Sequence, residues 1–208
     1  MPEVLEGAYG EKLRRAGEFF VKEGRVYQTL KQLARRLSEA GIDYAVLGGM
    51  ALAEHGFMRV TEDVDILLTS QGLARFTGEA LALGYMPAFE GARKSFLDVE
   101  TRVRVEILTT GEYPGDGKPK PVAFPDPCQA SAVIEGVNVI TLEKLIELKL
   151  ASGISAPHRL RDLADVQDLI QHLKLSLDLA QSLDPSVRPA FEERWRAAQE
   201  ARSEEDLG

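Results

Sequence analysis

The chain has 208 residues, 44% of them hydrophobic and 28% charged, which is typical of a globular protein and excludes a disordered or fibrous one. Its 33 acidic residues outnumber its 25 basic ones, so the formal net charge is −8. Because non-specific binding to nucleic acid relies on lysine and arginine to neutralise phosphates, this balance argues against a DNA partner and leaves RNA open only through a local basic patch.

Hydrophobic spacing predicts an N-terminal segment (1–25), an α/β domain (26–140) and a helical C-terminal region (141–208). In the first segment, residues 12–20 predict a short helix. In the second, apolar residues at helical spacing predict a helix over 26–40 that ends at Gly41. The other elements expected in the α/β domain are strands at 44–47 and 63–68, a helix from Ser70 to Leu83, and strands at 95–99 and 103–109.

A long loop separates the last of these strands from a hairpin. Residues 111–127 are too rich in proline and glycine for a helix or a central strand, and the loop either closes near the functional site or is a plain surface excursion. Glu135 and Gly136 between two short apolar runs predict a hairpin that completes a mixed sheet. The helices expected after it start at 142 with Thr141 as cap, cover 160–173, and run from 184 to 202 with Trp195 as a packing residue.

Two acidic residues, Asp63 and Asp65, lie two positions apart on the predicted strand 63–68. Since alternate residues of a strand point to one face, their side chains project together, with Cα atoms roughly 6 to 7 Å apart. Two carboxylates on a buried strand repel each other unless a hard cation such as Mg²⁺ accepts their oxygens as ligands. The spacing therefore predicts a metal site, against the alternative of two solvated acids at a strand end.

A double glycine, Gly48-Gly49, ends the apolar strand and precedes a segment of good helical propensity. A helix start offers unpaired N–H groups, and a missing Cβ lets a phosphate oxygen approach the main chain. Taken alone, Gly-Gly after a strand is usually a simple turn. Next to Asp63 and Asp65 it favours phosphate binding.

Residues 48–65 resemble the signature of polymerase-β-like nucleotidyltransferases, and especially the small bacterial group that includes AbiE-type toxins. The resemblance extends over about residues 26–172, and it implies the α/β nucleotidyltransferase fold, a mixed sheet with helices, followed here by a helical C-terminal extension. The matching residues are Gly48, Gly49, Arg59, Thr61, Asp63 and Asp65.

The resemblance also implies a third carboxylate on a later strand, and Glu106 is the only acid of the alternating run 103–108. A lysine on a helix is matched by Lys149, and a downstream Arg-x-Arg-Asp stretch by residues 159–162. Two positions depart from the family pattern: Met50 stands where many members have a small residue, and Glu106 replaces an aspartate.

Members of this family transfer a nucleoside monophosphate from an NTP to an acceptor hydroxyl and release pyrophosphate, with two Mg²⁺ ions as cofactors. By the resemblance, Asp63 and Asp65 would contact the triphosphate-bound ion, and Glu106 would hold the second ion and accept the proton of the acceptor. The acceptor would be a small molecule, a protein or an RNA end, and a toxin would imply an antitoxin partner. An inactive nucleotide-binding or antitoxin-like module of the same fold is the alternative. The residues expected to bind the nucleotide are Gly48, Gly49, Arg59, Thr61 and Lys149.

Several of these residues have simpler interpretations. Glu106 would then be a surface acid paired with Arg104 or Arg102, and Lys149 a surface lysine with a buried stem. Asp162 and Asp165 share a helix face, where they would orient a substrate or pair with nearby arginines. A basic side of the site was expected from Arg59, Arg93, Lys94, Arg102 and Arg104.

The single cysteine, Cys128, excludes a disulfide within the chain and a zinc cluster, and it fits a reducing compartment. The first residues contain no apolar signal-peptide core, and no stretch approaches the ~20 apolar residues that a membrane-spanning helix needs. We therefore expect a cytoplasmic protein without a membrane partner.

Overall fold

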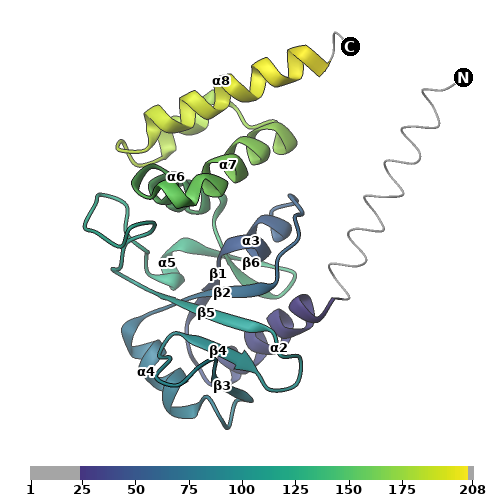
Figure 1. Cartoon of the computed structure of the whole chain (residues 1–208), viewed down its shortest axis with the longest axis vertical. Coiled ribbons are helices and arrows are strands. Elements are labelled where there is room, and N and C mark those ends of the chain that lie inside the picture. Colours follow the sequence, from purple (N-terminus) through teal and green to yellow (C-terminus); the bar gives the residue numbers. More distant parts are fainter. Residues whose placement is uncertain (1–23, 206–208) are drawn as a thin grey trace, which may run out of the picture.

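The structure, a computed structural model, describes residues 24–205 (Figure 1). The short helix expected at 12–20 lies outside these residues. The described strands are β1 (Tyr44–Val46), β2 (Asp63–Leu68), β3 (Tyr85–Pro87), β4 (Ser95–Asp98), β5 (Arg104–Thr109), β6 (Ser131–Ile134) and β7 (Val137–Ile140). The α-helices are α2 (Arg25–Glu39), α3 (Gly48–Glu54), α4 (Ser70–Glu79), α5 (Pro127–Ala130), α6 (Leu142–Ser155), α7 (Leu160–Leu173) and α8 (Arg188–Glu205), with 3₁₀ helices η1 (Pro157–Arg159) and η2 (Leu177–Ser182).

All described strands form one mixed sheet in the order β3-β4-β5-β2-β1-β7-β6. At its centre, β2 pairs in parallel with β5 and antiparallel with β1. β1 in turn pairs in parallel with β7, and the outer pairs are antiparallel. The strand that carries the two aspartates is therefore flanked on both sides, which fixes its backbone.

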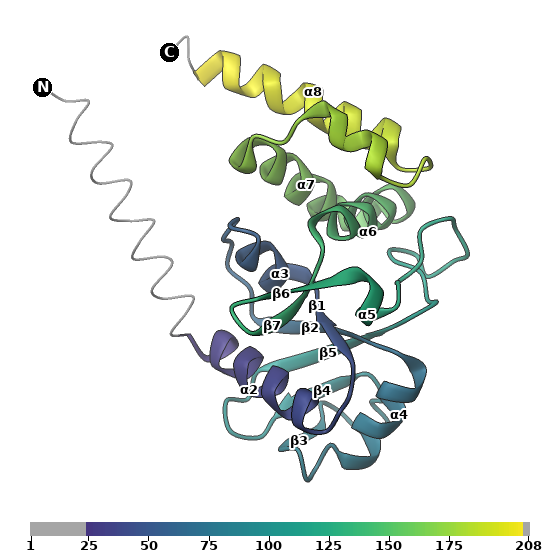
Figure 2. The same ribbon diagram turned by 180° about the vertical axis from the view of Figure 1, so that it is seen from behind.

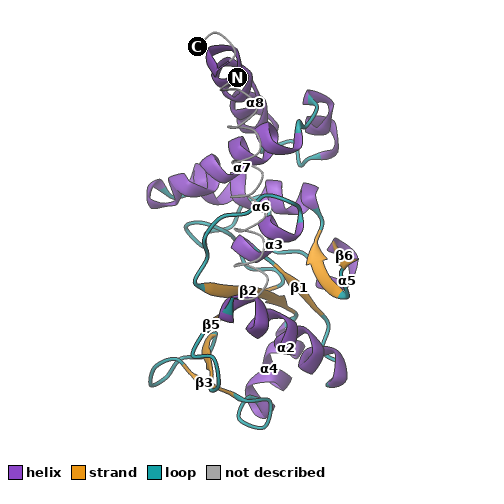
Figure 3. Cartoon of the chain, turned by 90° about the vertical axis from the view of Figure 1, so that its right-hand side faces the viewer, coloured by secondary structure: helices purple, strands orange, loops and turns teal. Residues whose placement is uncertain are grey.

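Helices cover both faces of the sheet, with α2 and α4 on one side and α3 and α6 on the other (Figure 3). The apolar face of α2 is buried through Leu30, Leu33 and Leu37. Each fully buried leucine contributes roughly 1.5 to 3 kcal/mol to folding, so this stripe holds the helix on the sheet. Phe76 of α4 packs edge-to-face on Phe96 of β4, with ring centroids 5.0 Å apart.

The C-terminal helices stack on the side of the sheet that carries α3, and α8 lies farthest from the strands (Figures 1 and 2). α6 packs against α7, and α7 packs against α8. The indole nitrogen of Trp195, on α8, donates a hydrogen bond of 2.9 Å to the carbonyl of Leu175, which follows α7. Trp195 is thus a packing residue, as predicted. Within residues 24–205, no helix has an apolar stretch long enough to cross a lipid bilayer.

Most predicted elements are confirmed, and their boundaries shift by a few residues. The helix from Ser70 ends at Glu79 rather than at Leu83, and its N-cap is Thr69, whose side chain accepts a hydrogen bond of 3.0 Å from the Gly72 N–H. The last helix begins at Arg188, after η2 and a turn, instead of at residue 184. Strand β3 has no counterpart among the predicted elements, because three residues at a sheet edge carry too short a pattern.

Candidate active site

Strand β2 presents Asp63 and Asp65 on the face of the sheet that looks toward α3 and α6. The residues between and after them, Val64 and Ile66, are buried on the opposite face, as the alternation of a strand requires. In the parallel ladder, Asp65 stands next to Glu106 of β5. The three predicted carboxylates therefore come from adjacent strands and share one face.

Gly48 and Asp65 are in close contact. A Cβ atom on residue 48 would lie 1.8 Å from Oδ2 of Asp65, and Gly48 has a φ of +60°, in the left-handed region that side chains disfavour. A Cβ on Gly49 would likewise lie 2.7 Å from Oγ1 of Thr61. The two glycines thus make room for polar side chains of the protein itself. From the sequence, this room was expected to serve an incoming phosphate.

Thr61 holds the first aspartate in place. Its hydroxyl donates a hydrogen bond of 3.1 Å to Oδ1 of Asp63. Because a hydroxyl–carboxylate bond fixes the side-chain rotamer, Thr61 acts here on the orientation of Asp63.

The environment of Asp65 disfavours its ionised form. Burial, and secondarily repulsion from Asp63 and Glu106, raises the pKa of Asp65 to about 6, and only the charges of Lys149 and Arg159 oppose this rise. A carboxylate with such a pKa is a functional-site candidate, because a bound cation would offset the cost of its burial and the repulsion from the neighbouring acids.

Glu106 is held by neighbours on its own sheet. Ser95 of β4 donates a hydrogen bond of 2.8 Å to Oε1 of Glu106, and Nη1 of Arg104 lies 3.7 Å from the same oxygen. The pairing with Arg104 that was weighed for Glu106 is therefore present. Oε1 of Glu106 is thus engaged by neighbours within the sheet.

The residues fit one Mg²⁺ ion better than a closed metal cage. Among the described residues, no three His, Cys, Asp or Glu side chains are grouped closely enough to share an ion. Mg²⁺, however, is usually bound through one or two carboxylates plus waters and substrate phosphates. Asp63 and Asp65 supply such a pair, and the raised pKa of Asp65 marks a place where a cation would relieve repulsion.

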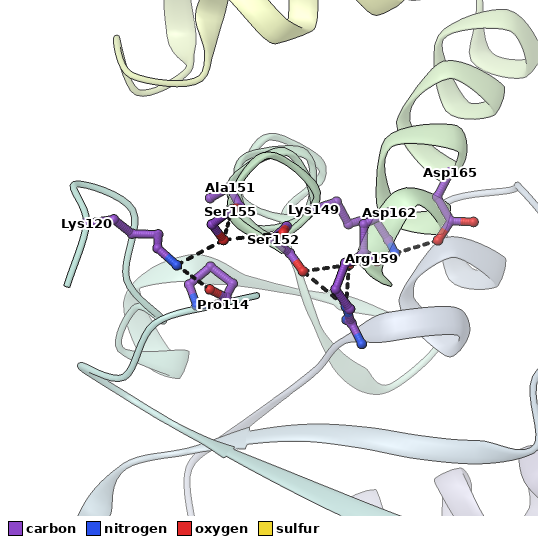
Figure 4. A network of polar contacts seen from close by, with 9 residues as sticks. All are labelled: Pro114, Lys120, Lys149, Ala151, Ser152, Ser155, Arg159, Asp162 and Asp165. Carbon is purple, nitrogen blue, oxygen red and sulfur yellow. Dashed lines mark hydrogen bonds and ion pairs between the residues drawn. The ribbon is translucent and has the colours of Figure 1, made fainter. Parts of the chain in front are cut away.

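Lys149 is a buried lysine and the centre of an ion network (Figure 4). Its Nζ lies 2.6 Å from Oδ2 of Asp165 and 3.1 Å from Oδ1 of Asp162, both on α7. Arg159 and Ser152 also donate hydrogen bonds to Asp162, of 2.8 and 2.6 Å. The interpretation of Lys149 as a surface lysine with a buried stem is wrong. Its side chain is buried, and its ammonium group is paired with Asp162 and Asp165.

This network sets the charge state of Asp162. Burial opposes its ionisation, but Lys149, Ser152 and Arg159 outweigh burial and lower the pKa of Asp162. Asp162 and Asp165 thus form the salt bridges that were one of their two predicted roles. Since Lys149 also lowers the pKa of Asp65, the network connects α6 and α7 electrostatically to β2.

Arg59 joins the same network from the loop before β2. Its Nε lies 3.1 Å from Oδ1 of Asp165, at an angle that does not make a hydrogen bond. The guanidinium is therefore a charge partner of a buried carboxylate, its Nη1 donates a hydrogen bond of 3.4 Å to the Val60 carbonyl, and the residue lines the larger of two cavities.

Two cavities meet at Asp65. The larger, of about 640 Å³, lies beside the Gly48-Gly49 turn and the loop before β2. The smaller, of about 320 Å³, extends along β5 under the loop after it. Gly48, Asp65, Lys149, Arg159 and Asp162 line both.

The larger cavity is lined by equal numbers of acidic and basic side chains. Glu62, Asp63, Asp65 and Asp162 provide four carboxylates, and Arg59, Lys149, Arg159 and Arg161 provide four basic side chains. Of the five residues expected to form a basic side of the site, Arg59 lines this cavity, whereas Arg104 pairs with Glu106 and Lys94 pairs with Glu112. The other basic lining residues are Lys149 of α6, which was expected to bind the nucleotide, and Arg159 and Arg161, which belong to the Arg-x-Arg-Asp stretch.

The sequence matches no protein-family model and no curated protein. Among solved structures, the chain is similar to ANT(2")-Ia in complex with adenylyl-2"-tobramycin, with 16% identity and a TM-score of 0.51 over 82% of this chain and 98% of that one. It is also similar to an antigenic nucleotidyltransferase-like protein from Paracoccidioides brasiliensis, with 18% identity and a TM-score of 0.51 over 84% of this chain and 94% of that one. With its mixed seven-stranded sheet and covering helices, the chain has the nucleotidyltransferase fold.

Proposed function

We propose that the protein is a Mg²⁺-dependent nucleotidyltransferase that transfers a nucleoside monophosphate from an NTP to an acceptor hydroxyl. The observation that carries this proposal is the position of Asp63 and Asp65, side by side on β2, at the wall of a cavity that also holds basic side chains. Carboxylates for a divalent ion and cations for phosphates are the two requirements of phosphoryl transfer.

In the proposed reaction, the acceptor oxygen forms a bond to the α-phosphorus, and the bond from that phosphorus to the oxygen of the leaving pyrophosphate breaks. Bound Mg²⁺ would neutralise phosphate charge and lower the pKa of the acceptor hydroxyl. Asp63 and Asp65 would hold the ion, with Thr61 fixing Asp63 through its hydrogen bond. Glu106, next to Asp65 in the ladder, would contribute to a second ion and take the proton of the acceptor.

Phosphate binding in the larger cavity would come mainly from arginines. Arg161 is exposed on α7, and half of the Arg159 side chain is exposed, so both present N–H groups to the cavity. Guanidinium groups suit phosphates because they offer several donors in a fixed plane. Lys149 and Arg59 are already paired with Asp165, and Lys149 would also offset part of the negative charge of Asp65.

The charge balance of the cavity supports a role for the metal. Its four carboxylates and four basic side chains offset one another, so the protein alone offers no net positive charge to an anionic nucleotide. Mg²⁺ on Asp63 and Asp65 would supply the missing charge. This predicts that NTP binding requires the divalent ion.

A small hydroxylated molecule, a protein side chain and an RNA end are the acceptor classes that we consider. The fold is shared with ANT(2")-Ia, whose structure holds adenylyl-2"-tobramycin, a small molecule bearing an adenylyl group, and this supports the first class. The role of a toxin with an antitoxin partner rests on the resemblance of residues 48–65 to the group that includes AbiE-type toxins. Arrested growth on expression of the chain, abolished by Asp65→Asn, would support that role.

One observation favours the alternative, a nucleotide-binding module without turnover. Oε1 of Glu106 accepts the hydrogen bond from Ser95 and lies 3.7 Å from Arg104, so the third carboxylate is engaged within the sheet. In that case NTP and Mg²⁺ would bind, and no product would form.

The test is incubation of the protein with each α-labelled NTP, Mg²⁺ and separate pools of RNA, protein and small molecules. We expect pyrophosphate release and label transfer to one pool, lost in Asp65→Asn and kept in the exposed control Glu90→Gln. Saturable Mg²⁺-dependent NTP binding without label transfer would support the module instead. Absence of NTP binding would overturn both proposals.

A further inference from the structure

The loop after β5 is closed at its neck. The Gly111 N–H donates to the Phe124 carbonyl at 2.9 Å, and the Phe124 N–H donates to the Glu112 carbonyl at 2.8 Å. These paired bonds make residues 112–124 a loop with a fixed base. The Thr110 hydroxyl adds a bond of 2.9 Å to the carbonyl of Pro125.

The far part of this loop is fastened to α6 (Figure 4). Lys120 Nζ donates to the Pro114 carbonyl at 2.6 Å and to Oγ of Ser155 on α6 at 3.0 Å, and it also bonds Asp116. Gly115 lies so close to α6 that a Cβ there would be 2.7 Å from the Ser152 carbonyl oxygen. With a φ of +75°, position 115 requires glycine both for its backbone and for this contact.

The fastened loop forms a wall of the smaller cavity. Tyr113 and Phe124 from the loop and Leu145 and Leu148 from α6 are among its lining residues. Asp65 is one of the residues that it shares with the larger cavity. Aromatic and aliphatic side chains thus line the smaller cavity beside the shared charged residues.

We propose that the smaller cavity binds the nucleoside part of the NTP, with the Tyr113 ring against the base, and that Lys120 is a positioning residue that sets base selectivity by holding the loop on α6. This inference rests on the proposed function. An NTP joins a polyanionic triphosphate to a planar, uncharged base. The larger, charged cavity would suit the triphosphate, and the adjoining smaller cavity, which has aromatic side chains in its wall, would suit the base. The walls of the smaller cavity carry three acidic residues, Asp65, Asp162 and Glu112, against two basic ones, Lys149 and Arg159, and this balance favours an uncharged occupant over an anionic one.

The first experiment separates the base from the phosphates. Calorimetric titrations would measure the affinities of the four NTPs and of inorganic tripolyphosphate, each with Mg²⁺. Loss of a base–aromatic contact typically costs about 1 to 3 kcal/mol, so Tyr113→Ala should weaken the preferred NTP about five- to 150-fold. Tripolyphosphate affinity should stay unchanged, and Tyr113→Phe, which keeps the ring, should bind NTP like the wild-type protein.

The second experiment tests the position of the loop. Lys120→Met removes the three bonds at the tip, and it should reduce the ratio of affinities between the best and the worst NTP while tripolyphosphate affinity is kept. Lys118→Met changes an exposed lysine of the same loop and serves as the matched control for lost charge. A purely structural role of Lys120 would lower affinity for all ligands alike, and it would overturn the positioning role.

Two outcomes overturn the inference in distinguishable ways. If Tyr113→Ala leaves NTP affinity unchanged and instead raises the KM of the acceptor, the cavity belongs to the acceptor and the proposed function stands. If the wild-type protein binds neither NTP nor tripolyphosphate with Mg²⁺, the proposed function fails together with the inference.

Discussion

Oδ2 of Asp65 lies in the space that a Cβ atom on Gly48 would occupy, at 1.8 Å from its ideal position. The β1–α3 turn and the acidic strand are therefore fitted to each other at one atom. A side chain at position 48 would displace the carboxylate that the proposed metal site needs.

Replacing Gly48 by alanine should lower both stability and activity. Gly41 provides a matched control, since it has the same φ of +60° and nothing within 4 Å of its ideal Cβ. Both Gly48→Ala and Gly41→Ala should lose about 1 to 2 kcal/mol of unfolding free energy from backbone strain, as measured by urea denaturation. Only Gly48→Ala should also lose about a hundredfold in label transfer, because Asp65 is misplaced. Equal activity of the two variants would show that the contact does not matter.

Asp65→Asn should make the protein more stable and inactive. The folded environment raises the pKa of Asp65 from 3.8 to about 6, so at pH 7 its charge destabilises the folded state by about 1 to 3 kcal/mol. Removing the charge without metal present should therefore raise the free energy of unfolding by an amount of this order. Label transfer should fall about a hundredfold or more, because a metal ligand is lost. A variant that is less stable than the wild-type protein would contradict the assigned cause of the pKa shift.

Stability without metal should fall as pH rises from about 4 to about 6. Across this window folded Asp65 retains a proton that the unfolded chain, with a pKa near 3.8, has already released, so the folded state binds more protons. Above about pH 6 this contribution is constant. Since other carboxylates also titrate in the window, the quantity to measure is the difference between the wild-type protein and Asp65→Asn in urea midpoints at several pH values.

Mg²⁺ affinity should change in the opposite direction, rising through the same pH window, because the ion binds only the ionised carboxylate. Titration of Mn²⁺ as a spectroscopic probe at pH 5, 6 and 7 would measure this increase. Affinity that does not depend on pH would mean that Asp65 is not a ligand.

Lys149→Met should strongly destabilise the protein. It leaves Asp162 and Asp165 buried without their shared cation, and breaking a buried ion pair on one side costs about 3 to 5 kcal/mol. The triple variant Lys149→Met, Asp162→Asn, Asp165→Asn removes the charges together and should recover much of this loss in urea denaturation. Lys118→Met, at an exposed position, should change stability by less than about 0.5 kcal/mol. If the triple variant were no more stable than Lys149→Met, the loss would come from packing and not from unpaired charge.

Local patterns in the sequence were sufficient for most of the fold. Alternation placed Asp63 and Asp65 on one face of β2, and apolar residues at helical spacing located α2, α6 and α7, with Gly41 marking the end of α2. Such signals arise from residues close together in the chain, so they need no knowledge of the rest of the molecule. The family resemblance then indicated the fold that the solved structures share.

The chemical surroundings of the site depended on tertiary structure. Only the packing of α6 against α7 showed that Lys149 is enclosed by Asp162 and Asp165, and only the sheet register showed Glu106 beside Asp65 and bonded to Ser95. The fastening of the 112–124 loop to α6 likewise joins residues more than thirty positions apart. Sequence determined which groups this protein carries and which face of their own element they occupy, because those follow from local periodicity. Their burial, partners and pKa values were decided by contacts between distant segments, which no local pattern encodes.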